Sequence, residues 1–197
     1  MNTIIPNIRD FAVSIILLLL ILLPSGMVRA HDFWIEPERF ILQEPDDIQL
    51  TLREGVDLKG DSLPYITDWF DDFSQFDGTG RRPIKSILGN DPAASIQVND
   101  GSTVVGYQST RHFVELGPEK FAAYLLEEGL QSILTLRKER GEENSSATEY
   151  FIRCAKAFLL SGPSNGNENY TDPLGYILEL IPESNLYKIL PGEDLSI

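Results

Sequence analysis

The chain has 197 residues, 42% of them hydrophobic and 23% charged, which is typical of a globular protein of one domain with room for part of a second. Its 16 basic and 30 acidic residues give a net charge of −14, which argues against nucleic acid and anionic lipid as partners, because phosphate binding requires clustered Lys and Arg. A single cysteine, Cys154, excludes an internal disulfide and a Cys-rich zinc site.

The N-terminal segment has the pattern of an export signal. Residues 11–23 form an apolar run with a single serine, too short to cross a membrane, which takes about 20 residues. A proline and a glycine follow the run, and a small or aliphatic residue then stands at each of the positions −3 and −1 before His31. We predict a signal peptide over residues 1–30, cut between Ala30 and His31; the alternative is an uncleaved anchor. The mature protein would be periplasmic or secreted, with no stable membrane span.

Short strands separated by turn signals dominate the next hundred residues. Ile48, Leu50 and Leu52 alternate with polar residues, which is typical of a strand with one buried face. β-Branched residues predict a strand at 103–107, whereas a polar, glycine-containing loop is expected at 54–64. The pattern predicts a mainly β fold, an Ig-like β-sandwich. Further extended segments are expected at residues 33–42, 68–77, 83–84, 112–116 and 150–160.

Two helices interrupt the strands. Pro118 stands at a favoured first helical position, and Gly129 is placed to end the first helix in a left-handed conformation. A second apolar stripe continues to about residue 140. We expect an inserted helical pair at 118–140 that packs on the sandwich through its apolar face, made of Phe121, Tyr124, Leu125, Leu130, Ile133 and Leu134.

The C-terminal part follows a linker rich in Gly, Asn and Pro at residues 161–173. We expect the β-sandwich domain to occupy residues 31–165 and a strand to form at 175–180. Residues 174–197 carry too few strand-like pieces to bury a core of their own. They are therefore interpreted as the start of an incomplete second strand-rich domain, either mobile or paired with an edge of the first.

Cleavage after Ala30 would make His31 the first residue of the mature chain. Its α-amine and its ring nitrogen can together chelate Cu²⁺ or Ni²⁺, which favour nitrogen ligands. Asp32 could add an oxygen ligand, and His112, the second of only two histidines, could complete a histidine brace. The alternative is that His31 merely follows the signal peptide and that His112 lies on a strand edge.

Catalytic motifs are missing from the sequence. Neither histidine lies in a nucleophile motif, and no Gly-rich phosphate loop follows a strand. We therefore expect no enzymatic activity and no catalytic residue.

A series of motifs along the chain resembles a known family. It opens with Ala30–Pro37 (AHDFWIEP) and is densest at 124–130 (YLLEEGL); other matching segments lie at 89–93, 106–109, 114–121, 153–157 and 178–182. In this order the motifs resemble a bacterial exported family of unknown function that often carries a NikM-like nickel- or cobalt-transport label. The resemblance implies an exported β-sandwich protein with a role beside metal uptake.

The sequence departs from that family in two ways. Family members usually continue past the segment like 186–193 into a second strand-rich domain, whereas this chain ends within the first strands of that domain. His112 also stands where family members often have other polar residues.

These observations lead to one main hypothesis and two alternatives. The main hypothesis is a periplasmic, non-enzymatic protein accessory to the binding and uptake of a transition-metal ion (nickel, cobalt or copper), with a membrane metal-importer complex or another envelope protein as partner. The first alternative is a metal-free envelope module for protein–protein interaction. The second is a copper oxidase that uses a histidine brace.

Overall fold

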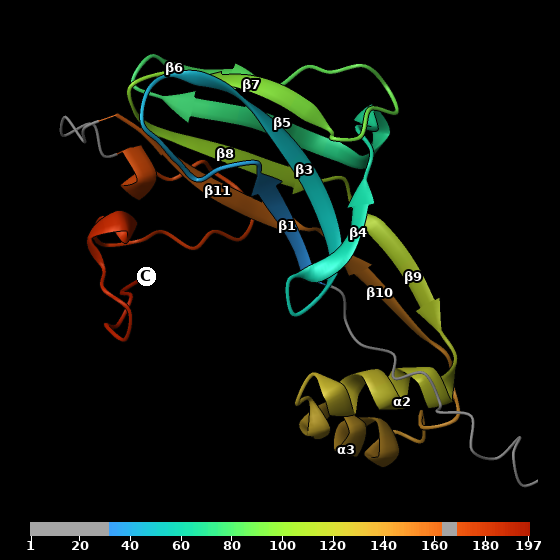
Figure 1. The fold of residues 1–197 in the computed structure, drawn as a ribbon. Coiled ribbons are helices and arrows are strands. Elements are labelled where there is room, and N and C mark those ends of the chain that lie inside the picture. The colour runs from blue at the N-terminus through green and yellow to red at the C-terminus, as the bar shows by residue number, and fades with distance from the viewer. Residues whose placement is uncertain (1–31, 163–168) are drawn as a thin grey trace, which may run out of the picture.

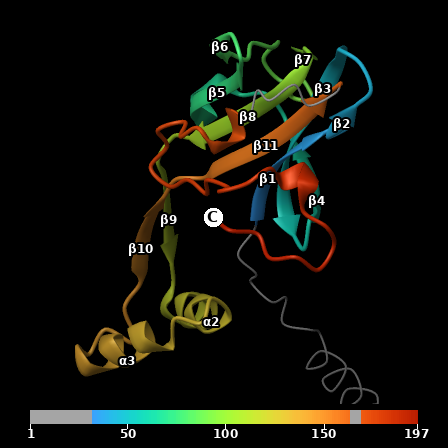
Figure 2. The same ribbon diagram turned by 90° about the vertical axis from the view of Figure 1, so that its left-hand side faces the viewer.

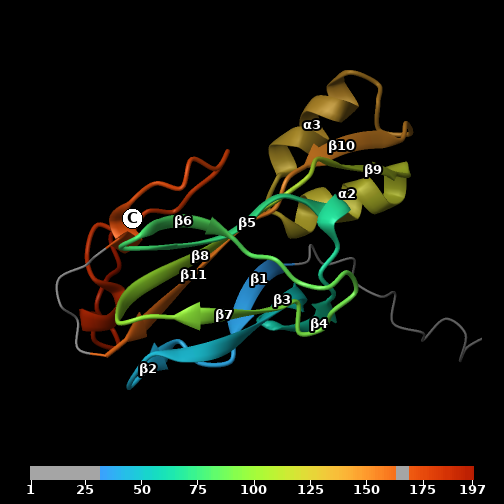
Figure 3. The same cartoon turned by 90° about the horizontal axis from the view of Figure 1, so that it is seen from above.

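The computed structural model describes residues 32–162 and 169–197. Two sheets face each other in the main body, as Figure 3 shows. One sheet is built around the long strand β3 (Asp46–Val56), which pairs with β1 (Asp32–Pro37) on one side. On its other side β3 pairs with β7 (Ala94–Val98) and β4 (Lys59–Leu63). This half of the sandwich therefore depends on a single central strand.

The second sheet has five strands. Their spatial order is β2 (Ile41–Leu42), β11 (Cys154–Ser161), β8 (Gly101–Ser109), β5 (Phe70–Asp77) and β6 (Gly80–Pro83). β2 runs parallel to β11, and the other pairs are antiparallel. The chain passes from β1 of the first sheet to β2 of the second and back to β3 of the first, so the two sheets are connected early in the sequence.

Alternating side chains from both sheets form the core. Ile48, Leu50 and Leu52 of β3 are at most 2% exposed, as their alternation predicts. They belong to one cluster with Val105, Tyr107, Phe73, Ala157 and Leu159 of the second sheet. The structure confirms a mainly β sandwich with an inserted helical pair.

The polar loop expected at 54–64 is instead a hairpin between β3 and β4. Asp57 and Leu58 form its turn with φ values of 53° and 57°, the geometry that continues a twisted hairpin. Gly55 and Gly60 face each other across the two strands, and a Cβ on either would meet the other strand's backbone. The prediction was wrong because polar composition hid a strand pair that needs glycine for close backbone approach.

An arm projects from one end of the sandwich (Figures 1 and 2). Its stem is the antiparallel pair β9 (His112–Leu116) and β10 (Ala147–Phe151). Its tip holds the two predicted helices, α2 (Pro118–Glu127) and α3 (Gln131–Glu139). Gly129 ends the first helical segment with a φ of 71°, as expected.

The expectation that the helical pair packs on the sandwich is wrong. Both helices lie at the far end of the arm, away from the two sheets (Figure 1). Leu125 is the one buried residue of α2, and α3 has none. Leu130 and Ile133 are 40% and 37% exposed. The periodic apolar face of the pair is therefore used for contact between the two helices, and part of it remains exposed to solvent.

Residues 169–197 lie across the outer face of the five-stranded sheet (Figure 2). They contain two short 3-10 helices, at Asn169–Thr171 and Leu186–Lys188, and the strand predicted at 175–180 does not form. Tyr170 and Leu174 are buried against Val104 of β8. The segment therefore covers a sheet face and pairs with no strand that the structure describes; that it begins a second domain stays a prediction.

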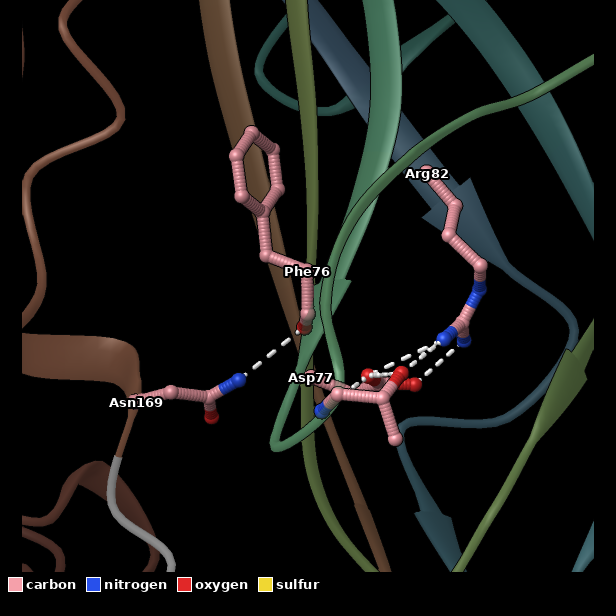
Figure 4. A network of polar contacts seen from close by, with 5 residues as sticks. Phe76, Asp77, Arg82 and Asn169 are labelled. Atoms are coloured by element: carbon pink, nitrogen blue, oxygen red, sulfur yellow. Dashed lines mark hydrogen bonds and ion pairs between the residues drawn. The ribbon is translucent and has the colours of Figure 1, made fainter.

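Polar contacts fix the beginning of this segment. The Asn169 amide donates to the Phe76 carbonyl at 3.0 Å, next to the ion pair between Asp77 and Arg82 (Figure 4). Asp77 also accepts from the backbone N–H and the hydroxyl of Thr79. The turn between β5 and β6 is thereby held rigid where Asn169 binds to it.

Candidate functional site

A pocket of about 340 Å³ lies at the root of the arm, where both sheets meet β9. Four of its residues come from the sheet around β3 and the short helix Thr67–Trp69, two from β8, and two from the arm and its return to the sandwich. They are Phe33, Glu54, Leu63, Trp69, Tyr107, Ser109, His112 and Arg153. We call this the root pocket.

Hydrogen bonds at the root of the arm hold together the two segments that connect the sandwich to the arm. The Ser109 N–H donates to the Arg153 carbonyl at 2.8 Å, and the Arg153 N–H donates to the Ser109 hydroxyl oxygen at 2.9 Å. These two connecting segments, at residues 110–111 and 152–153, belong to no strand. Ser109 is only 1% exposed, so these bonds are shielded from water and position the backbone of Arg153.

The side chain of Arg153 carries the positive charge of the root pocket. Its guanidinium forms an ion pair with Glu54, and the two side chains are 27% and 25% exposed. It also lies 4.9 Å above the ring of Phe151, which stacks on His112 with 5.3 Å between ring centroids. The Phe151 ring therefore contacts both a guanidinium and an imidazole.

Aromatic rings form the apolar wall. The Phe33 and Tyr107 rings lie 4.7 Å apart, and the Tyr107 hydroxyl donates to the Trp69 carbonyl at 3.3 Å. Burial raises the pKa of Tyr107 to about 12, although the nearby Arg153 charge acts in the opposite direction. Tyr107 therefore keeps its proton at neutral pH and remains a hydrogen-bond donor.

The predicted site residues are placed unequally by the structure. Ala30 and His31 lie outside the described residues. Asp32 is exposed at the start of β1, opposite Gly55, and does not line the root pocket. Its neighbour Phe33 does line the pocket, as His112 does, because successive side chains of a strand point to opposite faces. The start of β1 and His112 therefore border the same pocket.

Within residues 32–162 and 169–197, no three His, Cys, Asp or Glu side chains gather into a cluster that could hold a metal ion. His112 is the one imidazole among them.

Sequence reasoning missed Glu54 and Arg153. They are 99 residues apart, and no motif links them. Arg153 lies in the segment 153–157, which was noted for its resemblance to the family and not for its chemistry. Glu54 lies in the stretch 54–64 that was predicted to be a loop. A strand assignment through residue 56 would have placed Glu54 in a strand, but its pairing with Phe33 comes from the tertiary structure.

A second pocket, of about 310 Å³, lies between β11 and the C-terminal segment. Cys154, Lys156 and Phe158 line one side, and Tyr176 and residues 178–180 line the other. The Cys154 thiol donates to the side-chain oxygen of Gln108 at 3.8 Å, a weak bond that ties it to β8.

Fold and site together define a two-sheet β-sandwich protein with a helix-tipped arm and a pocket at the root of that arm. The chain belongs to the family described as a domain of unknown function, DUF4198, whose model matches residues 28–197. No curated protein and no solved structure matches the chain. In the part of the chain that the structure describes, no helix has the length and apolarity needed to cross a membrane.

Proposed function

We propose that this protein is exported and serves, without catalysis, as an accessory to the binding and uptake of a transition-metal ion (nickel, cobalt or copper). The mature N-terminus would supply the first ligands through the α-amine and ring nitrogen of His31. The supporting observation is that Phe33 and His112 line one pocket. Two residues extend at most about 7 Å along the chain, so His31 begins within that distance of Phe33.

The donor set suits the proposed ions. An α-amine and two imidazoles are nitrogen ligands, which favour Cu²⁺ and Ni²⁺ over Mg²⁺ or Ca²⁺. His112 is partly exposed and held by its stacking on Phe151, so its orientation is set before any ion binds. Asp32 does not line this pocket; as the residue that follows His31 in the chain, it would add an oxygen ligand beside the nitrogen donors.

The proposal is tested by titrating Cu²⁺ and Ni²⁺ into three forms of the protein: one that begins at His31, one with a single extra residue before His31, and the His31→Ala variant. The extra residue converts the α-amine into an amide, which is a poor ligand. Affinity is expected to fall more than tenfold, or by about 1.4 kcal/mol, in the second and third forms. A competing chelator must buffer the free metal, because the acidic surface collects divalent ions without specific geometry.

Equal affinity of the three forms would refute the metal site. An envelope module for protein–protein interaction would then be the better description, and the projecting arm with its exposed Leu126, Leu130 and Ile133 favours that second candidate. His112→Ala provides a further comparison, since it removes the imidazole without changing the N-terminus.

A further inference from the structure

The second pocket, between β11 and the C-terminal segment, is lined mainly by apolar side chains. Phe158 and Cys154 lie on the β11 side, and Tyr176, Leu178 and Leu180 lie on the other. We propose that this pocket binds a small, uncharged and mainly apolar molecule, with an aliphatic chain or a ring as its body. The inference uses none of the residues proposed to hold a metal ion.

The charged groups in the wall of the second pocket are already paired. Lys156 and Glu179 both line the pocket and form an ion pair at 2.8 Å, with each side chain only 8% exposed. A carboxylate on the ligand would compete with Glu179 for the ammonium group, and a cation on the ligand would compete with Lys156 for the carboxylate. Either would disturb a buried ion pair, which is costly. An uncharged ligand leaves the pair intact.

The other polar groups of the lining side chains also have partners. The Tyr176 hydroxyl donates to the Asp72 carboxylate of β5, and the Cys154 thiol is bonded weakly to Gln108. The surface that remains for a ligand is therefore mainly carbon and sulfur. Such a lining favours van der Waals contact with an apolar molecule over hydrogen bonding.

The size and the rim of the second pocket also suit a small apolar molecule. Its volume of about 310 Å³ lies within the range of small-molecule sites, roughly 300–1,000 Å³. Leu178 and Leu180 border it and are 72% and 65% exposed. A bound ligand would therefore cover apolar surface that now faces water, which is favourable.

Both walls are fixed before a ligand arrives. On one side, β11 is hydrogen-bonded between β2 and β8. On the other side, the C-terminal segment is tied to the sheet by the Lys156–Glu179 pair. The Ile177 N–H also donates to the side-chain oxygen of Gln108 at 3.1 Å. A preformed pocket reduces the entropy that binding would otherwise lose.

The test is a calorimetric titration of 1-octanol into the mature protein in chelator-treated buffer. Octanoate and octylammonium have the same chain length and carry one negative or one positive charge. The affinity for 1-octanol is expected to exceed that for each ion about tenfold or more, because burial of a charge without a partner is costly. Failure of 1-octanol to bind, or equal affinity for either ion, would overturn the proposal.

Cys154 provides a readout at the pocket itself. It is the single cysteine of the chain, so alkylation by iodoacetamide reports on this one thiol. Saturating 1-octanol should slow the alkylation severalfold, because the ligand covers the thiol. An unchanged or faster rate would mean that 1-octanol binds elsewhere or loosens the fold, and would overturn the assignment to this pocket.

Two neighbouring side chains provide a matched pair of variants. Ile177 and Leu178 are both 72% exposed, but of the two only Leu178 lines the pocket. Leu178→Glu places a charge at the rim and should reduce the affinity for 1-octanol about tenfold, whereas Ile177→Glu should leave it unchanged. Equal effects of the two substitutions would contradict binding in this pocket.

The His31→Ala variant separates this proposal from the metal proposal. Neither wall of the second pocket contains a residue proposed as a metal ligand, so the variant should bind 1-octanol as the unaltered protein does. Loss of 1-octanol binding in His31→Ala would contradict a separate apolar site. Failure of the metal titration, in contrast, leaves the second pocket unaffected.

Discussion

The Lys156 ammonium lies 2.8 Å from the Glu179 carboxylate, and both side chains are only 8% exposed. The pair connects β11 to the C-terminal segment. Glu179 also accepts from the backbone N–H groups of Leu174 and Gly175, at 2.7 and 3.0 Å. One carboxylate therefore joins the sheet to the backbone of a segment that forms no strand pairing among the described residues.

Removing this carboxylate should detach the segment. Among the described residues, Glu179→Ala leaves the buried Lys156 ammonium with one remaining bond, a 3.4 Å contact to the Leu180 carbonyl. We expect a loss of roughly 3 kcal/mol, the cost of breaking a buried pair. Urea unfolding and hydrogen exchange at residues 169–180 measure the effect. The double variant Lys156→Met with Glu179→Gln removes both charges and should lie closer to the wild type; an equally large loss in the double variant would contradict this explanation.

Acid should weaken the same contact. Burial by itself raises the pKa of Glu179, but Lys156 and the backbone N–H groups of Leu174 and Gly175 lower it further, so the pKa lies below its ordinary value of 4.5. Its contribution to stability is therefore complete above pH 4.5 and is lost as the pH falls through the folded-state pKa.

Unfolding measured from pH 7 to pH 3 should show this loss. Glu179→Gln should remove part of the acid dependence and leave the part due to Asp77. Burial raises the pKa of Asp77, but Arg82 and Thr79 lower it below its ordinary value. An unchanged pH profile in Glu179→Gln would refute the assignment.

Gly106 should prove intolerant of a side chain. A Cβ at this position would collide with Tyr176 and Leu174 of the C-terminal segment. We expect Gly106→Ala to cost about 1–3 kcal/mol, as overpacking does, and to increase hydrogen exchange in that segment. Gly117→Ala is the matched control, because a Cβ there meets nothing within 4 Å; equal effects of the two substitutions would contradict the packing described.

Leu125→Ala should unfold the tip of the arm while the sandwich stays folded. Leu125 is 2% exposed, and its truncation should cost the helical pair about 2–5 kcal/mol. Hydrogen exchange should rise across residues 118–139 and stay unchanged at 103–107. Leu126→Ala is the control, since the adjacent leucine is 54% exposed. Loss of protection in β8 would show that the helices support the sandwich after all.

Much of the fold could be predicted from local pattern. The alternation of Ile48, Leu50 and Leu52 identified a strand with one buried face, because side chains of a strand alternate between its two sides. Pro118 identified the start of the first helix, because its fixed backbone angle suits the first helical position. Gly129 identified the end, because glycine readily adopts the left-handed conformation that terminates a helix. The hairpin at 54–63 was not predicted, because its pairing depends on two glycines that let the two strands approach closely. Such a contact between strands cannot be seen in the local sequence.

The candidate site was predictable only in part. His112 was singled out for its chemistry, whereas Glu54 and Arg153 were missed because their contact joins residues 99 apart in the chain. Placement of Phe33 beside His112 depends on how β1, β8 and β9 meet.

By itself, the sequence determined the types of the main elements, the acidic charge and the predicted export signal, since these follow from residue composition and local periodicity. Only the tertiary structure decided that the helical pair stands away from the sandwich and that residues 169–197 cover a sheet face. The physical reason is that an apolar stripe specifies a surface to be buried but not its partner. Leu125 is buried in the helical tip of the arm and Leu174 against a sheet, and the periodicity of the sequence is the same for any apolar partner.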